Sequence, residues 1–392
     1  MGFASGNISF QRFAITGPFA DHIDDAFIAR VQKRGIGKAA TQADETQIGW
    51  IGPRHVLDET IEPAAVAFGS FAFLAVRLDR LRAPAGVIKA YVRLEEQALL
   101  EAGGREFLSK GEKRKARETA VDRAEKEARD GDFRRMGAYP VLIDLPHRVV
   151  YFGNTGTSMA DKFIALFRDT FGAPLEPLGP ETIAQRIMRA AKNPRALENL
   201  PPLRLVKPPD GGDGALAEHD LTFLGRELLT WLWFRTEQDE RQLRVQDGDE
   251  IAVLIDKSLR LKCCFSVSGT TTIAADSPAT LPEARAALRS GKLPIKAGLI
   301  LGSRVGEFRL TFDGPKFAVS GLTLPDGDRL PTFAARVEQR FEQMTDAAAI
   351  LDALFELFLQ ERVSREWNAT QRAMTAWANG EVVAGPRTAI SA

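Results

Sequence analysis

Basic side chains gather in one stretch of the chain, and such residues can contact phosphate groups. The stretch contains Lys110, Lys113, Arg114, Lys115, Arg117, Arg123 and Lys126. Lysine and arginine bind the phosphates of DNA whatever its sequence, and the binding releases counterions. A solvated helix has the same composition, since Glu112 and Glu118 stand beside the basic residues and Glu125 and Arg129 have the spacing of a helical ion pair. The residue pattern leaves both interpretations open.

A second group of chemically active side chains is acidic. It comprises Asp247, Asp249, Glu250 and Asp256, all in a predicted hairpin. Carboxylates held close together can bind the magnesium ion of a nuclease, so this activity is kept as an alternative. A hairpin turn with solvated acids is the simpler interpretation, because no second acidic cluster supports a nuclease.

Other catalytic patterns are missing from the chain. The four histidines are scattered, and no two share a helical face at metal-ligand spacing: His22, His55, His147 and His219. There is no Walker A loop and no Gly-x-Ser-x-Gly elbow. The adjacent Cys263 and Cys264 lie in a strand-like setting that predicts buried free thiols. We therefore expect no catalytic residue, no metal site and no cofactor.

The composition is that of a soluble globular protein. Among 392 residues, 52 lysines and arginines balance 52 aspartates and glutamates, so the formal net charge is zero. A function in nucleic-acid binding would therefore depend on a local patch rather than on a global field. The chain has neither the pattern of a signal peptide nor a run of about 18 apolar residues, so we predict no membrane span and a cytoplasmic location.

The basic stretch lies within residues 87–135, a charged segment that we predict to be an inserted helical arm. The segment contains no proline, and after Gly111 it is typical of a long surface helix. Alanine recurs every four residues at Ala116, Ala120, Ala124 and Ala128. This spacing puts the four alanines on one helical face, a narrow stripe that lets another backbone come close.

Strand and helix patterns surround the arm. Apolar and alternating segments predict strands at residues 9–16, 46–53 and 65–78, a hairpin at 139–152, and helices at 19–34 and 158–171. They form two strand–helix units, residues 1–86 and 136–180, which we expect to make one α+β core domain that the arm interrupts.

Beyond the core, a connector rich in proline and glycine is predicted at residues 181–220. It leads to a predicted C-terminal α/β domain, residues 221–380, followed by a loose tail, residues 381–392. Its expected elements are a helix at 221–237, a hairpin at 241–267, strands at 297–324 and a helix or helix pair at 332–360. Trp231 and Trp233 are assigned to the core or a subunit interface rather than to base stacking, because their helical neighbours are apolar.

Short motifs on both sides of the arm occur in a recognisable order. They are Gly49-Trp50-Ile51-Gly52-Pro53, then Val87-Ile88-Lys89 opening the arm, then Asp132-Phe133-Arg134-Arg135 and the strand Tyr139–Asp144. In this order they resemble the RdgC family of bacterial recombination-associated proteins. The resemblance covers about residues 8–180, and the remainder matches only in pieces.

The resemblance implies a DNA-binding protein without enzymatic activity. Family members form a ring-shaped homodimer whose positively lined hole accepts duplex DNA with little sequence preference, and they restrain RecA-type recombinases by occupying the DNA. Phe133 matches the family aromatic at the dimer gate, so Phe133 and Arg134 are the expected interface residues. Glu218 and His219 stand where compact members carry basic and amide residues at this gate.

The sequence thus leads us to expect a homodimer that binds double-stranded DNA through the seven basic residues of the arm. It would act in the cytoplasm, associated with the nucleoid, as an antagonist of a RecA-type recombinase. A magnesium-dependent nuclease and a scaffold whose arm binds another protein are the alternatives.

Overall fold

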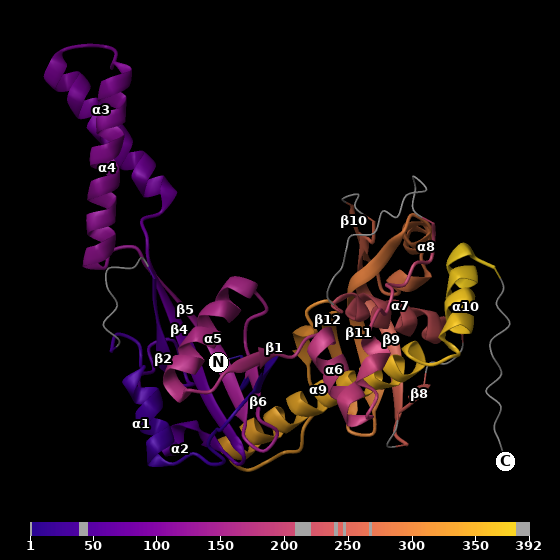
Figure 1. Cartoon of the computed structure of the whole chain (residues 1–392). Coiled ribbons are helices and arrows are strands. Elements are labelled where there is room, and N and C mark those ends of the chain that lie inside the picture. Colours follow the sequence, from indigo (N-terminus) through magenta and orange to yellow (C-terminus); the bar gives the residue numbers. More distant parts are fainter. Residues whose placement is uncertain are drawn as a thin grey trace, which may run out of the picture.

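One antiparallel sheet runs through the computed structural model, which describes residues 2–38, 46–207, 221–238, 242–245, 248–265 and 269–381 (Figure 1). Its 13 described strands are β1 (Ile8–Ile15), β2 (Thr46–Ile51), β3 (Ala67–Phe68), β4 (Phe71–Leu81), β5 (Arg134–Asp144), β6 (Val149–Phe152), β7 (Leu175–Pro177), β8 (Gln242–Arg244), β9 (Glu250–Cys263), β10 (Thr270–Ala274), β11 (Lys292–Ser303), β12 (Gly306–Asp313) and β13 (Ala318–Thr323). The strand order is β10-β9-β11-β12-β13-β1-β6-β5-β4-β2, and β3, β7 and β8 pair with β4, β1 and β9.

The described helices pack on this sheet or project from it. They are α1 (Asp25–Lys33), α2 (Pro63–Val66), α3 (Ala85–Gly103), α4 (Lys110–Asp130), α5 (Thr157–Phe171), α6 (Pro180–Ala190), α7 (Phe223–Glu237), α8 (Pro282–Arg289), α9 (Phe333–Arg362) and α10 (Trp367–Asn379). Two short 3-10 helices cover Pro194–Leu197 and Pro278–Thr280. The fold is therefore of the mixed α+β class, as the sequence predicted.

Strand β1 joins the two halves of the sheet. Its first residues pair with β13, where Phe10 lies opposite Val319, and its later residues pair with β6, where Phe13 lies opposite Val150. The two predicted strand–helix units and the C-terminal strands consequently belong to one sheet rather than to separate ones.

Helix α9 holds the same two halves together from one face. Near its start, the Phe341 ring packs on Phe73 of β4 with the ring centroids 4.9 Å apart. In its middle, Asp352 accepts a hydrogen bond from Arg12 of β1 at 2.5 Å. Toward its end, Phe358 contacts Trp231 of α7 at 5.8 Å between ring centroids. Figure 1 shows this helix running beneath both halves of the protein.

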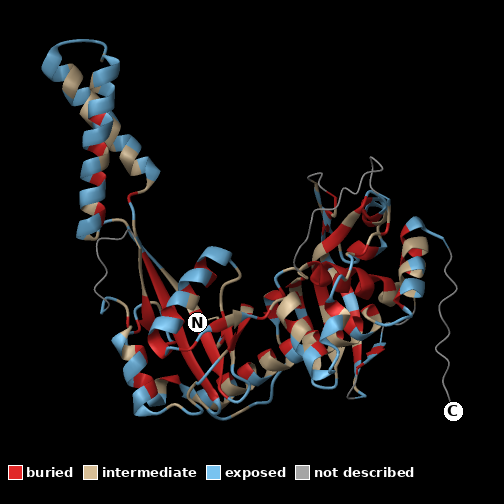
Figure 2. Cartoon of the chain, in the orientation of Figure 1, coloured by how far each residue is buried: buried red, intermediate tan, exposed pale blue. Residues whose placement is uncertain are grey.

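Alternation along the strands divides the apolar side chains between two cores. On β4, Ala72 and Leu74 face the core formed with α1 and α5, whereas Phe71 and Phe73 face the core that includes α7 and α9. Strand β4 is thus covered on both faces, which explains why its sequence is nearly continuously apolar. Figure 2 shows this burial, and it also shows the arm as mostly exposed.

Several predicted elements differ in extent from the structure. The first helix begins at Asp25 rather than at residue 19, because the Asp24 carboxylate accepts a hydrogen bond from the Phe27 N–H at 2.7 Å and caps the helix. The last predicted helix extends to Arg362, and α10, which the sequence did not predict, follows it. Strand β10 and helix α8 were not predicted either.

The C-terminal region, in which the sequence predicted helices and strands, contributes an antiparallel part of the sheet. The described pairs among β8 to β13 are all antiparallel. Only two residues separate β11 from β12 and four separate β12 from β13, and connections this short allow only antiparallel neighbours. The prediction that Trp231 and Trp233 are buried is confirmed, since both have 0% of their surface exposed.

The arm is an insertion between two paired strands. β4 and β5 pair along their whole length, and the last pair joins Leu81 to Arg134. The chain leaves the sheet after Leu81, forms α3 and α4, and returns at Arg134.

Some of the predictions fall on parts of the chain that the structure does not describe. The expected gate residues Glu218 and His219 lie outside the described residues, as do Asp247 of the acidic group and residues 382–392 of the predicted tail. Of that tail, only Glu381 is described, directly after the end of α10.

Candidate nucleic-acid interface

The arm is a hairpin of two helices, and the long helix predicted after Gly111 is the second of them, α4. Helix α3 ends at Gly104, whose left-handed conformation (φ 57°) suits glycine, and α4 begins at Lys110. The four alanines of the predicted stripe are the buried residues of α4. Because alanine is small, they let α3 pack closely against α4, and Figure 1 shows the pair projecting from the sheet.

One aromatic contact between the helices adds to the alanine packing. The Tyr91 hydroxyl on α3 donates a hydrogen bond to Glu127 on α4 at 2.5 Å, and the Arg123 guanidinium lies 4.3 Å from the centre of the Tyr91 ring. Arg123 also pairs with Glu127 at 3.1 Å. Arg123 thus contacts both the Tyr91 ring of α3 and the Glu127 carboxylate of α4.

The end of the arm farthest from the sheet is held by a capping box. The Glu112 N–H donates to the Ser109 hydroxyl at 3.2 Å, and the Glu112 carboxylate accepts from the Ser109 N–H at 2.8 Å. Arg105 pairs with the same carboxylate at 2.6 Å. These hydrogen bonds from Ser109, with the Arg105 ion pair, hold the pKa of Glu112 at about 2. Glu112 is therefore ionised at neutral pH, and its ion-pair partner is Arg105.

Charge separates along the arm into two regions. The arm tip, Arg105–Arg117, has six basic and two acidic side chains, whereas the arm stem, Glu118–Asp132, has three basic and six acidic ones. A 21-residue helix is about 30 Å long, and charges in physiological salt are screened within about 8 Å. The acids at the far end of the stem therefore contribute little to the potential at the start of α4, whereas Glu118 lies next to the tip and pairs with Arg114.

The predicted DNA-contacting residues divide between these two regions. Five are exposed at the tip, namely Lys110, Lys113, Arg114, Lys115 and Arg117, and Arg123 and Lys126 lie on the stem. Arg114 makes one exposed ion pair with Glu118 at 3.5 Å, a contact that contributes little. Within the described part of the chain, the other four tip residues of this set have no ion pair.

The predicted interface residues lie at the opposite end of the arm. Arg134 is exposed at the start of β5, and Phe133 is half-buried just before it. Phe133 has a positive φ of 60°, a conformation that costs free energy for a side chain with a Cβ. Phe133 follows the C-terminal end of α4 and the basic tip includes the first turns of that helix, so the two lie at opposite ends of the arm.

A further set of basic residues, which the sequence did not predict, lies on the C-terminal half of the sheet. This sheet patch consists of Arg260, Lys262, Lys296 and Arg309. Arg260 lies directly opposite Lys296 on the neighbouring strand, and like charges in that position are destabilising. Lys296 is offset by Asp313 at 3.4 Å, and Arg309 by Glu307 at 2.9 Å. The alternation of buried leucines with charged residues in Leu259–Lys262 was the pattern that could have revealed the open face.

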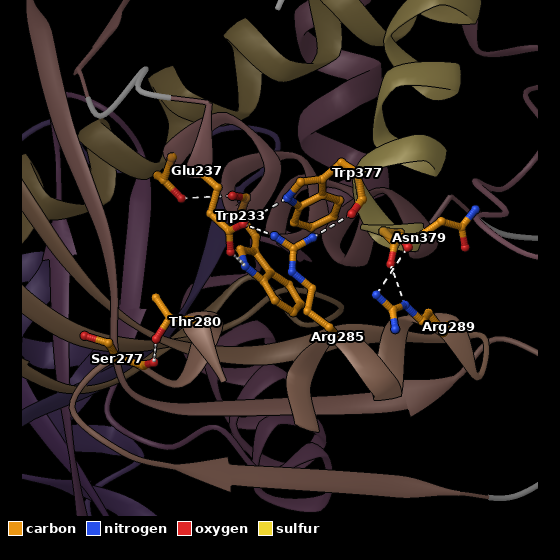
Figure 3. Close-up of polar contacts among 10 residues, drawn as sticks. Trp233, Glu237, Ser277, Thr280, Arg285, Arg289, Trp377 and Asn379 are labelled. Carbon is orange, nitrogen blue, oxygen red and sulfur yellow. Dashed lines mark hydrogen bonds and ion pairs between the residues drawn. The ribbon is translucent and has the colours of Figure 1, made fainter. Parts of the chain in front are cut away.

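A pocket of about 520 Å³ lies beside α7 and α8 and could be mistaken for a ligand site. Figure 3 shows that its charged groups serve to join helices. The Glu237 carboxylate accepts hydrogen bonds from Trp233 Nε1 at 2.6 Å and Trp377 Nε1 at 3.0 Å, and it pairs with Arg285. Arg285 also donates to the Trp377 carbonyl oxygen at 2.8 Å. The polar groups satisfy one another and fasten α10 onto α7 and α8.

Of the acidic residues proposed for a nuclease, the structure describes Asp249, Glu250 and Asp256, and it does not bring Asp256 to the other two. Asp249 pairs with Arg304 at 2.9 Å and Glu250 pairs with Arg244 at 2.9 Å. Asp256 lies six residues beyond Glu250 on β9, which is about 20 Å along a strand. Among the described residues, no three His, Cys, Asp or Glu side chains are grouped so that they could hold a metal ion.

Neither a scan against protein-family models nor a search of curated proteins finds a match for this chain. Of the helices in the described ranges, none has the length and apolar character needed to cross a membrane.

Proposed function

We propose that this protein binds duplex DNA without sequence preference through the basic tip of its arm. The observation that carries the proposal is the concentration of exposed cations, most of them without acidic partners, at the end of a projecting hairpin. Lysine and arginine side chains placed this way gain free energy by releasing the counterions of the phosphates. The N-terminus of α4 lies at the same end, and its helix dipole adds positive potential.

The composition of the tip favours contacts with the DNA backbone over base readout. Between Arg105 and Arg117 there is no asparagine or glutamine, the side chains that read adenine in the major groove. Lysines there act as point charges that position the protein on phosphates. Binding should therefore depend strongly on salt and weakly on sequence.

We further propose that the protein acts as a homodimer and restrains a RecA-type recombinase by occupying DNA. The resemblance of the motifs around the arm to the RdgC family supports this part of the proposal, and the sheet patch offers a second cationic surface to the same ligand. In a strand-exchange assay, the recombinase should be inhibited only at protein concentrations that cover the DNA.

Two matched double variants of α4 test the proposal. Lys113→Ala/Lys115→Ala removes two tip charges, and Lys126→Ala/Arg129→Ala removes two exposed stem charges. Binding is measured by fluorescence anisotropy with two unrelated duplexes between about 50 and 200 mM salt, a range chosen because phosphate contacts respond to it. The tip variant should weaken binding to both duplexes alike and flatten the log–log salt slope by about 1.8, because each lost phosphate contact removes about 0.9. The stem variant should keep the slope of the unaltered protein.

Other outcomes would contradict the proposal in different ways. Equal losses in the two variants would mean that DNA contacts run along the whole arm. If the unaltered protein bound no duplex even at the lowest salt, the arm would instead serve a protein partner, as in a scaffold. Cleavage of plasmid in the presence of magnesium, abolished by Asp249→Ala, would establish the nuclease.

A further inference from the structure

The connection between α3 and α4 presents one aromatic side chain to solvent. Phe107 has 83% of its surface exposed, the highest value among the large hydrophobic residues that the structure describes. Single exposed hydrophobic residues are common on proteins, but they are seldom this exposed and seldom stand at the end of a projecting element. The position of Phe107 therefore needs a physical explanation.

The backbone on both sides of Phe107 is held in place. At the α3 end, the Arg105 N–H donates to the Leu100 carbonyl oxygen at 3.3 Å across the left-handed Gly104. At the α4 end, Ser109 and Glu112 form the capping box, and the Arg105–Glu112 ion pair joins the two ends of the connection. Because the connection is already ordered, a contact made by Phe107 costs little conformational entropy.

The charges around Phe107 select the kind of partner. Six basic side chains of the arm tip surround it in sequence, so the tip of a second copy would bring the same charge and be repelled. An apolar protein surface would leave these cations without partners. A nucleic acid satisfies both features, since its phosphates pair with the cations and its base pairs offer apolar faces to an aromatic ring.

We propose that Phe107 is a wedge that inserts between adjacent base pairs of duplex DNA while the arm-tip cations hold the flanking phosphates. This inference rests on the proposed DNA binding and adds its mode. Apolar side chains inserted at a base step partly unstack it and kink the duplex. Steps that are already weakened, such as a mismatch, cost less to open, so the protein should prefer them although it reads no base sequence.

The test measures insertion and binding separately. A duplex carrying 2-aminopurine reports unstacking by a rise in fluorescence, and anisotropy reports binding of the same duplex. The unaltered protein and Phe107→Leu, which retains an apolar wedge, should both raise the 2-aminopurine signal. Phe107→Ala should abolish the rise, remove the preference for a mismatched duplex and weaken binding roughly tenfold, the scale of one lost stacking contact, with the salt slope retained. Phe333→Ala, which removes another exposed phenylalanine outside the arm, is the control and should behave as the unaltered protein.

Four results would overturn the inference. Binding without any 2-aminopurine response would leave the proposed function intact and reject the wedge. A response that survives in Phe107→Ala would assign the unstacking to another residue. Dissociation of a dimer by Phe107→Ala in sedimentation would show Phe107 to be a subunit contact. The absence of binding to any duplex at low salt would instead reject the proposed function itself, and the wedge with it.

Discussion

At the scale of single residues, the charged side chains of this protein divide into two kinds. Those at the arm tip are exposed and mostly without acidic partners, whereas several in the core are paired and buried. Arg362 on α9 and Glu227 on α7 form a buried ion pair at 2.6 Å, with 3% and 1% of their side chains exposed. Burial raises the pKa of Glu227, and the adjacent Arg362 opposes that rise. Residues of the first kind are available to a ligand, and residues of the second kind are committed to the fold.

Removing one partner of the buried pair should destabilise the protein strongly. Arg362→Ala leaves the Glu227 carboxylate buried without its cation, and such a loss costs about 3–5 kcal/mol. Urea unfolding should show this decrease in the free energy of unfolding. Arg365→Ala removes an exposed arginine three residues away and should change the value by less than about 0.5 kcal/mol. Equal effects of the two substitutions would show that the buried pair contributes nothing specific.

One motif residue that supports the family resemblance, Trp50, has a structural role. Trp50 is buried, and its Nε1 donates to the Thr170 hydroxyl of α5 at 2.8 Å. Its role is therefore to fix β2 against α5 and not to contact DNA. A resemblance carried by a buried residue such as Trp50 concerns the fold of the half that contains β2 and α5. The proposed function depends instead on residues of the arm, which the motifs only flank.

At the scale of elements, the arm is a self-contained hairpin inserted in a continuous strand pair. Its two helices pack on each other through the alanine stripe and the contact of Tyr91 with Glu127 and Arg123. The strands on either side are already paired up to Leu81 and Arg134. The pairing of β4 with β5 therefore does not require the arm, which is consistent with an arm that serves binding.

Excision of the arm tests this separation. Replacing residues 82–133 by an Asn-Gly turn joins Leu81 to Arg134 and converts β4 and β5 into an ordinary hairpin. We expect a folded protein, with an unfolding midpoint equal to that of the full chain, that no longer binds duplex DNA in the anisotropy assay. An unfolded product would show that the arm supports the core. If the shortened protein still bound DNA, the DNA contact would be assigned to the sheet patch instead of the arm.

At the scale of the whole molecule, β1 and α9 make the two halves of the protein one structure. Strand β1 pairs with both halves of the sheet, and α9 contacts β4 at its start and α7 toward its end. The base of the arm, at Leu81 and Arg134, is thus attached to a sheet that is continuous with the C-terminal half.

Phe133 is the residue at which the proposed dimer can be tested. Phe133→Ala should shift the protein toward the monomer in analytical sedimentation, because an aromatic anchor at an interface often contributes about 2 kcal/mol or more, roughly a thirtyfold change in the dimer dissociation constant. Phe107→Ala is the matched control at the other end of the arm and should remain a dimer. An unchanged association constant for Phe133→Ala would remove Phe133 from the interface.

Local patterns in the sequence determined the α+β class, the buried tryptophans of α7 and the alanine stripe of α4, because each depends on side-chain spacing within one element. The sequence also located the basic stretch. Only the tertiary structure decided that this stretch splits into a cationic tip and an acidic stem. That division depends on where α3 ends at Gly104 and on the commitment of Glu112 to Ser109 and Arg105. The antiparallel continuation of the sheet through β1 likewise depends on contacts between distant segments, which no local pattern encodes.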